Sequence, residues 1–316
     1  MKLHNSKVVI VGAGVVGSTI AYCLVVRGIC SEVVIIDVNY EKALGEVLDL
    51  KHSIEYLDRN VSVKAGSYEE CRDADVVVIT AAAPRNGETN RLNLIRDTSK
   101  IIRTVTEQVM SNGFDGRFVV VSNPVDVMSY YVYKLSGLPK NQVIGTGTAL
   151  ETARLKQIIG EIMNIDPKSV QAYSMGEHGD SQMVPWSHVR AGGKSFCDIL
   201  EDNRERFAHV DLEDLVQKTR VAGHEVLARK NSTQYGIASA AAAIIAAVLR
   251  NENKMIPVST YLEGEYGIHD VFCGVPAILN IEGVKEIGEF RLTAEERLKL
   301  QESAAIIKEY IKQLQF

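Results

Sequence analysis

Apolar runs rich in β-branched residues recur along the first half of the chain, and stretches with helical patterning separate several of them. These runs lack polar alternation, which is typical of strands buried on both faces. Because such strands alternate with helices in parallel βαβ units, the pattern predicts a doubly wound α/β sheet over residues 1–145. The expected strands are Lys7–Val11, Glu32–Ile36, Val61–Lys64, Asp75–Thr80 and Arg117–Ser122, and the expected helices include Ser18–Arg27, Glu41–Leu50 and Asn93–Met110.

Residues 146–316 follow a different pattern, with long helical stretches and fewer strands, and they predict a mixed α+β domain. A chain of 316 residues has room for about two domains. The expected helices are Leu150–Met163, Leu212–Ala228, Tyr235–Leu249 and Thr293–Leu314, and the expected strands are Val170–Tyr173, Met255–Tyr261 and Val271–Leu279.

Charge and composition exclude several classes of protein. The net charge of −5 argues against nucleic-acid binding, which usually needs a concentrated basic face. The most apolar helical stretch, Gly236–Leu249, has 14 residues and is too short to cross a bilayer. No secretory signal follows the first apolar run, and the cysteines are odd in number without a C-x-x-C pair, so we expect a cytoplasmic protein without membrane partners. The five cysteines are Cys23, Cys30, Cys71, Cys197 and Cys273.

A glycine-rich turn follows the first expected strand and opens a helical pattern. It has the G-x-G-x-x-G form, with Gly12, Gly14 and Gly17 at the three fixed positions. Asp37 ends the next strand, twenty residues after Gly17. In this context the turn predicts a dinucleotide site, with the phosphates at the start of the helix. A carboxylate at Asp37 suits a ribose hydroxyl and repels a 2′-phosphate, which favours NAD over NADP.

Three charged residues in the second half suggest acid–base chemistry on an anionic substrate. His178 lies in the segment Met175–Ser181, between glycines, and its ordinary pKa suits a proton shuttle. Glu151 and Arg154 are three residues apart and share one face of an expected helix. The carboxylate could orient His178, and the guanidinium could bind a carboxylate through two hydrogen bonds. Taken alone, the pair is also compatible with an ordinary surface ion pair.

Two polar segments follow strands of the first half, at the edge where ligands of open α/β sheets bind. Residues 81–92 contain Arg85 and Arg91, and residues 122–126 contain Asn123 before Pro124. The first segment is equally compatible with a solvated charged loop. The amide of Asn123 could contact a nicotinamide.

Five of these motifs, taken in their order along the chain, resemble those of the lactate/malate dehydrogenase family over nearly the whole chain, and are most similar to those of its bacterial L-lactate dehydrogenases. The five are Gly12–Gly17, Asp37, Ser122–Asp126, Leu150–Arg154 and Gly176–Ser181. The resemblance implies a Rossmann NAD-binding domain, a catalytic α+β domain and hydride transfer between NAD and (S)-lactate or pyruvate. It also implies a homotetramer and no metal. By the same resemblance His178 is the acid/base and Glu151 its partner carboxylate. Arg154 anchors the substrate carboxylate, and Arg91 polarises the substrate carbonyl.

The resemblance further implies substrate contacts from Arg85, Asn123 and Thr233. The residues that it places along the NAD groove, beyond the motif glycines and Asp37, are Val16, Lys42, Tyr68, Ala82, Ala83, Thr104, Val121, Asn123 and Thr146.

Three positions depart from the family pattern. The partner carboxylate is normally Asp, and the longer Glu151 could displace His178 by about 1 Å, an error that costs on the order of 10²-fold in rate. This leaves open a weakly active NAD(H)-binding protein. Arg85 stands where lactate dehydrogenases have Gln and malate dehydrogenases have Arg, which leaves malate dehydrogenase as an alternative. Glu177 and Thr233 favour lactate.

The third departure concerns regulation. Lys156 and Gln171 replace an Arg and a His that bind fructose 1,6-bisphosphate in activated relatives. We therefore expect weak or absent activation by this compound.

Overall fold

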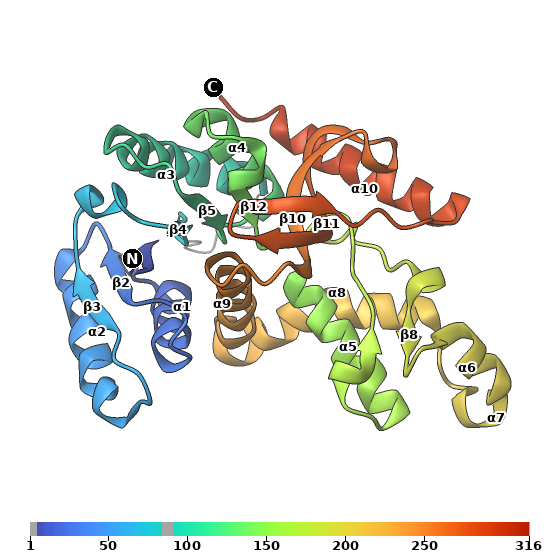
Figure 1. The fold of residues 1–316 in the computed structure, drawn as a ribbon. Coiled ribbons are helices and arrows are strands. Elements are labelled where there is room, and N and C mark those ends of the chain that lie inside the picture. The colour runs from blue at the N-terminus through green and yellow to red at the C-terminus, as the bar shows by residue number, and fades with distance from the viewer. Residues whose placement is uncertain (1–4, 84–90, 316) are drawn as a thin grey trace.

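The structure is a computed structural model that describes residues 5–83 and 91–315. Within these residues, nine strands form one sheet with helices on both faces (Figure 1). The strands of the first half are parallel, and their order, β6-β5-β4-β1-β2-β3, reverses beside β1. This arrangement confirms the predicted doubly wound sheet and places a ligand crevice at the carboxyl ends of β1 and β4. The bounds are β1 (Lys7–Val11), β2 (Glu32–Ile36), β3 (Ser62–Ala65), β4 (Val76–Ile79), β5 (Arg117–Val120) and β6 (Val143–Gly145).

The central strands are buried on both faces because each face is covered by helices. Val8 and Ile10 of β1 point into a core with α1, α2 and α9, whereas Val9 and Val11 point into a core with α3, α4 and α10. All four side chains are at most 3% exposed, which explains why the strand has no polar alternation. The bounds are α1 (Val15–Val26), α2 (Tyr40–Ser53), α3 (Arg91–Ser111), α4 (Val125–Ser136), α9 (Tyr235–Leu249) and α10 (Ala294–Ile311).

Strands from the second half extend the same sheet. β10 (Lys254–Glu263), β11 (His269–Asn280) and β12 (Gly283–Ile287) pair antiparallel. They join the parallel part where Ser259 of β10 lies opposite Gly145 of β6. Ser259 is thereby brought to the carboxyl edge of the parallel strands.

The remaining elements form a smaller outer layer around α5 (Ala149–Met163) and α8 (Leu212–Lys230). The strand expected at Val170–Tyr173 ends at Gln171, because the backbone N–H of Ser174 donates to Thr152 Oγ1 of α5 instead of continuing a ladder. The other elements of this layer are α6 (Phe196–Asp202), α7 (Arg204–Phe207), β7 (Val170–Gln171), β8 (Arg190–Ala191) and β9 (Lys194–Ser195).

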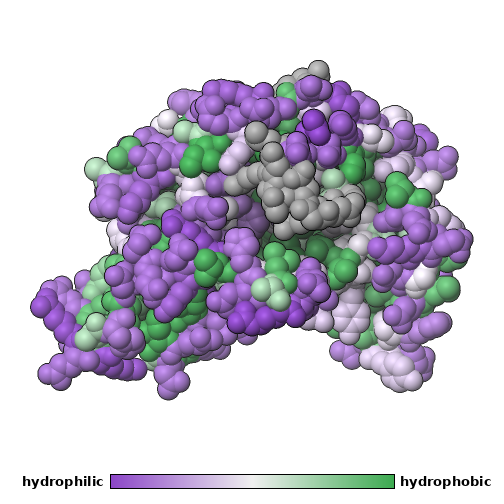
Figure 2. Space-filling view, turned by 180° about the vertical axis from the view of Figure 1, so that it is seen from behind, coloured by the Kyte–Doolittle hydropathy of each residue, from purple (hydrophilic) through white to green (hydrophobic). Residues whose placement is uncertain are grey.

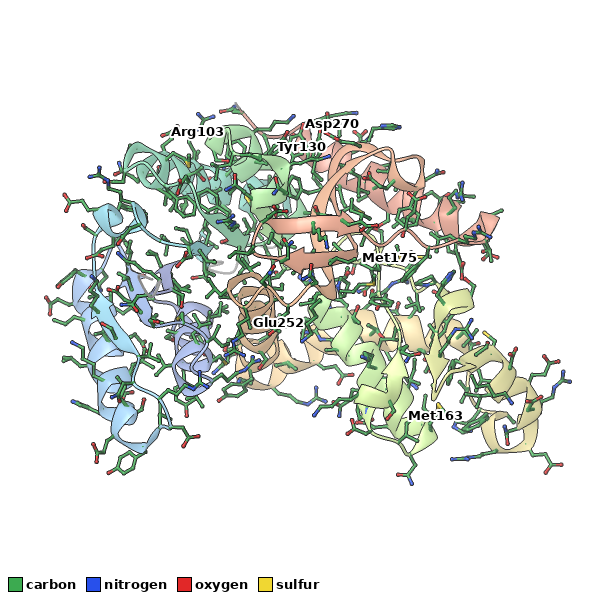
Figure 3. All side chains as sticks on the ribbon, viewed as in Figure 1. Arg103, Tyr130, Met163, Met175, Glu252 and Asp270 are labelled. Atoms are coloured by element: carbon green, nitrogen blue, oxygen red, sulfur yellow. The ribbon has the colours of Figure 1, made fainter. Side chains whose placement is uncertain are left out.

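Helix α4 is fastened to the β10–β11 hairpin at the top of the molecule, where Tyr130 and Asp270 lie together (Figure 3). The Tyr130 hydroxyl donates to Asp270 Oδ1 at 3.1 Å, and the Tyr261 hydroxyl donates to the same oxygen at 2.7 Å. The contact of Tyr130 ties the middle of α4 to the hairpin, while the first turn of α4 enters the site described below.

The surface is mainly hydrophilic on the face seen in Figure 2, with hydrophobic side chains in small separate groups. No helix within the described residues is both long and apolar enough to cross a membrane.

Candidate active site

The glycine-rich turn packs against the end of β4. Gly12 has a φ of +114°, and a Cβ there would lie 2.6 Å from Thr80 Oγ1. A Cβ on Gly17 would lie 1.9 Å from the carbonyl oxygen of Gly12. Both positions therefore require glycine. The Thr80 hydroxyl, which the sequence did not single out, donates to the carbonyls of Val11 and Gly12 and holds the turn.

The N-terminal end of helix α1 has the features that an anion-binding site requires. Its N-cap residue Gly14 makes no side-chain cap, and its first turn contains no acidic residue. The N–H groups at this end are therefore not covered by a side chain of their own helix, and the helix dipole adds to their attraction for phosphate.

Asp37 follows β2 and faces the same turn. Its Oδ2 accepts from the Ala13 N–H at 2.7 Å, and its Oδ1 accepts from the Asn39 N–H at 2.9 Å. A carboxylate has about four lone-pair sites, so both oxygens can still accept from ribose hydroxyls. The turn, the helix start and Asp37 together fit NAD.

The other predicted cofactor residues lie on several elements. Thr146 and Val121 are buried at the carboxyl ends of β6 and β5, and Asn123 is exposed beyond β5. Thr104 is exposed on α3, where its hydroxyl donates to its own helix at Lys100. The remaining positions are Val16 on α1, Lys42 on α2, Tyr68 at the start of a 3₁₀ turn, and Ala82 and Ala83 after β4.

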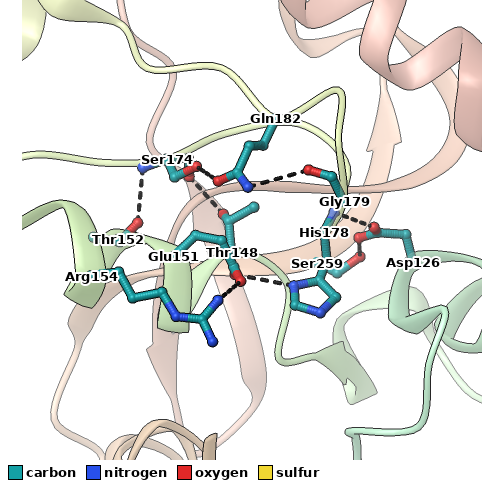
Figure 4. Close-up of polar contacts among 10 residues, drawn as sticks. All are labelled: Asp126, Thr148, Glu151, Thr152, Arg154, Ser174, His178, Gly179, Gln182 and Ser259. Carbon is teal, nitrogen blue, oxygen red and sulfur yellow. Dashed lines mark hydrogen bonds and ion pairs between the residues drawn. The ribbon is translucent and has the colours of Figure 1, made fainter. Parts of the chain in front are cut away.

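The loop that carries His178 is held by hydrogen bonds from both sides (Figure 4). Thr148 Oγ1, just before α5, donates to the Ser174 carbonyl at 2.6 Å, and Ser174 Oγ donates to Gln182 Oε1 at 2.7 Å. Gln182 Nε2 in turn donates to the Gly179 carbonyl at 3.2 Å. The loop therefore presents His178 from a fixed backbone.

Glu151 joins His178 and Arg154 into one cluster (Figure 4). Its Oε2 lies 3.1 Å from His178 Nδ1, and its Oε1 accepts from Arg154 Nη1 at 2.9 Å. Neither Oε2 nor Nδ1 has another hydrogen-bond partner among the described residues, so each atom is the polar partner of the other. The Glu151 side chain is 3% exposed, whereas those of His178 and Arg154 are 25% and 18% exposed. The carboxylate is thus buried behind two groups that a ligand can reach.

The charges of the cluster favour a protonated histidine. Burial alone would lower the pKa of His178, but the charge of Glu151 and its contact with Nδ1, together with the charge of Asp126, raise the pKa to about 9. Burial alone would raise the pKa of Glu151, but the charges of His178 and Arg154 hold it below its ordinary value. With Nδ1 facing Glu151, His178 can give or take a proton through Nε2.

Of the other predicted substrate residues, the structure describes the side chains of Thr233 and Asn123 only. Thr233 is half-buried between α8 and α9, and Asn123 lies at the carboxyl edge of β5. Helix α3 begins at Arg91, whose side chain lies outside the described part of the chain, as does all of Arg85.

Two buried residues of the site had no predicted role. Asp126 of α4 accepts from the His178 backbone N–H, and Ser259 of β10 donates to Asp126. Asp126 lay inside the segment singled out for Asn123, and an acidic residue within an apolar helix is the signal that could have identified it. Ser259 sits in an apolar strand and gives no such signal.

Comparisons with known proteins identify the family of the chain. The family model for the lactate/malate dehydrogenase NAD-binding domain matches residues 6–145, and that for the alpha/beta C-terminal domain of the same family matches residues 148–315. L-lactate dehydrogenase 3 of Bacillus cereus is 47% identical over 313 residues, which cover 99% of each chain. L-lactate dehydrogenase 1 of Bifidobacterium longum is 49% identical over 308 residues and 98% of each chain. Among solved structures, the ligand-bound minor L-lactate dehydrogenase from Enterococcus mundtii has a TM-score of 0.96 at 43% identity, covering 99% of both chains.

Proposed function

Because the chain belongs to the lactate/malate dehydrogenase family and is an NAD-dependent 2-hydroxy acid dehydrogenase, we propose that its own substrates are L-lactate and pyruvate. The observation that carries the proposal is the buried Glu151, which contacts His178 with one oxygen and Arg154 with the other. A proton donor beside an anion-binding guanidinium is what reduction of a 2-oxo acid requires, and the contacts of Glu151 support these roles for His178 and Arg154. Relatives of nearly full length that bear the name L-lactate dehydrogenase support the choice of substrate.

Each residue of the cluster has a separate role in the proposed reaction. NAD, when bound, supplies or accepts the hydride at C2 of the substrate. The planar guanidinium of Arg154 pairs with the substrate carboxylate, and His178 Nε2 gives its proton to the carbonyl oxygen during reduction. In the reverse direction, neutral His178 takes the hydroxyl proton. The Glu151 carboxylate accepts a hydrogen bond from the Nδ1–H group of His178, which keeps the ring oriented. Its negative charge stabilises the protonated ring.

Further residues would complete the pocket. Arg91 would polarise the carbonyl from the start of α3, and Asn123 and Thr233 would contact the substrate. Residues 1–145 would hold the cofactor through Gly12, Gly14, Gly17, Asp37 and the groove residues named above, and residues 146–316 would bring the acid–base cluster to its nicotinamide end.

The test is a comparison of kcat/KM for pyruvate and for oxaloacetate with NADH. We expect pyruvate to be preferred by at least about 10²-fold, because an unpaired second carboxylate costs several kcal/mol in a closed pocket. A preference for oxaloacetate would establish malate dehydrogenase instead, with Arg85 as the candidate for binding the second carboxylate. The Arg85→Gln variant then serves as the control, because a ratio that it leaves unchanged excludes Arg85 from the pocket.

We also propose that the protein is a cytoplasmic homotetramer. All five cysteines are free, which suits a reducing compartment. The outer faces of α1 and α2 expose Tyr22, Val26 and Leu48, which are 51%, 41% and 47% accessible and could be covered by another subunit. Sedimentation equilibrium should give four times the chain mass of 34.8 kDa, and a single-chain mass would contradict the tetramer.

A further inference from the structure

A second buried carboxylate lies behind the acid–base histidine, on the side away from Glu151 (Figure 4). Asp126, in the first turn of α4, is 2% exposed. Its Oδ2 accepts from the His178 backbone N–H at 2.8 Å, and its Oδ1 accepts from Ser259 Oγ at 2.5 Å. One carboxylate therefore joins helix α4, the histidine loop and strand β10.

The charged groups around this pair come from several elements. Glu151 and Arg154 of α5 face His178, and Glu177 of the loop itself acts on Asp126. From β11, the buried Cys273 lies close enough to Asp126 for the carboxylate to raise the pKa of its thiol. His178 is thus the group that compensates the charge of Asp126 most directly, and Ser259 supplies a neutral donor.

We propose that Asp126 is a positioning residue for the reaction, which holds the backbone of His178 through its N–H and stabilises the protonated ring by its charge. The inference rests on the proposed role of His178 as acid and base. It adds a carboxylate from the NAD-binding half of the chain to the one that α5 supplies.

The ionisation of the two groups agrees with this role. Burial raises the pKa of Asp126 to about 6, although the hydrogen bonds from Ser259 and from the His178 backbone oppose the rise. Above that pH the carboxylate is charged, and its charge contributes to the raised pKa of His178. Between these two values the site contains a charged Asp126 beside a protonated His178.

The Asp126→Asn variant separates charge from shape. The amide oxygen can accept from the His178 N–H, and its NH₂ group can donate to Ser259 Oγ, since a hydroxyl also accepts. Only the charge is removed. The measurement is kcat/KM for pyruvate against pH, and we expect its alkaline limb to move down by about one pH unit. Asp126→Glu, which keeps the charge, should stay closer to the wild-type limb.

Glu296→Gln is the matched control. Glu296 of α10 is also a buried carboxylate, and it accepts from the backbone N–H and the hydroxyl of Ser187. The change disturbs a similar network away from His178, so it should lower thermal stability and leave the alkaline limb in place. A limb that is unchanged in a folded Asp126→Asn variant, or that moves equally in both variants, overturns the proposal.

Two further measurements keep the proposal testable. Where Asp126→Asn does not fold, Asp126→Ser removes the same charge with a smaller side chain and should move the limb down in the same direction, while an unchanged limb counts against the proposal. NMR titration of the His178 ring, assigned by His178→Asn, reads the same shift without turnover. An enzyme inactive on both 2-oxo acids would refute the proposed function, and the NMR titration would still decide the role of Asp126.

Discussion

Glu151 Oε2 lies 3.1 Å from His178 Nδ1, although its side chain is one methylene longer than the aspartate that the sequence resemblance predicts at this position. The extra methylene was expected to endanger this contact. The structure shows the carboxylate reaching both His178 and Arg154 from the first turn of α5. The backbone at this position therefore suits the longer side chain, and the longer residue does not itself separate the acid–base pair.

Removing the charge of Glu151 should slow the reaction. In Glu151→Gln the amide can present its NH₂ group to Nδ1, which favours the wrong ring tautomer and leaves the protonated ring without its counter-charge. We expect kcat/KM for pyruvate to fall by about 10²-fold or more. NADH binding, measured by fluorescence titration, should be unchanged.

Glu151→Asp is the control for side-chain length at position 151. The shorter side chain keeps the charge but draws the carboxylate back, so we expect activity between those of the wild type and Glu151→Gln. An Asp variant faster than the wild type would show that the native glutamate misplaces His178.

Arg154 should govern substrate binding. Arg154→Lys keeps a positive charge but loses the planar fork that pairs with a carboxylate through two hydrogen bonds. We expect KM for pyruvate to rise by about 10²-fold, with a smaller change in kcat. Initial-rate kinetics over a wide range of pyruvate concentration measures both. A variant with the wild-type KM would place the substrate carboxylate elsewhere.

The raised pKa of His178 predicts opposite pH dependences for the two directions. Pyruvate reduction needs the protonated ring, so its kcat/KM should fall as the pH rises through about 9. Lactate oxidation needs the neutral ring, so its kcat/KM should rise over the same interval. Initial rates in both directions across this range test the assignment, which fails if both limbs run in the same direction.

Regulation by fructose 1,6-bisphosphate should be weak. Lys156 of α5 is half-buried, and burial lowers the pKa of its ammonium group, while Gln171 of β7 carries no charge. Of these two positions only Lys156 can therefore carry a positive charge, and burial disfavours its charged form. We expect the compound to change KM for pyruvate by less than about twofold. A large fall in KM on its addition would contradict this.

Much of the fold follows from local patterns. Buried strands such as Lys7–Val11, which is apolar after its first residue and is followed by a glycine-rich turn, predicted the doubly wound sheet, because burial on both faces leaves no polar alternation. Strand β12 (Gly283–Ile287) was missed, since it is an edge strand in which only Gly283 is buried. The extension of the sheet at Ser259 and Gly145 was missed because single-residue pairing between distant segments leaves no trace in either one.

Some residues of the site could likewise be predicted from the sequence, and others could not. His178, Glu151 and Arg154 could be predicted because their residue types and spacing reflect their chemistry, and the structure brings them together. The contact of Asp126 with the His178 backbone could not, because its partner is an N–H group that every residue except proline carries. Thr80 was missed for a similar reason, since it bonds only to backbone carbonyls.

The central claim is that His178, oriented by Glu151, transfers the proton when a 2-oxo acid is reduced. The most direct measurement compares pyruvate reduction by the wild type and by His178→Asn at neutral pH, with NADH binding measured in parallel. We predict that kcat/KM falls by about 10³-fold or more in the variant while NADH binds as before. A variant that retains activity within about tenfold of the wild type would contradict the account.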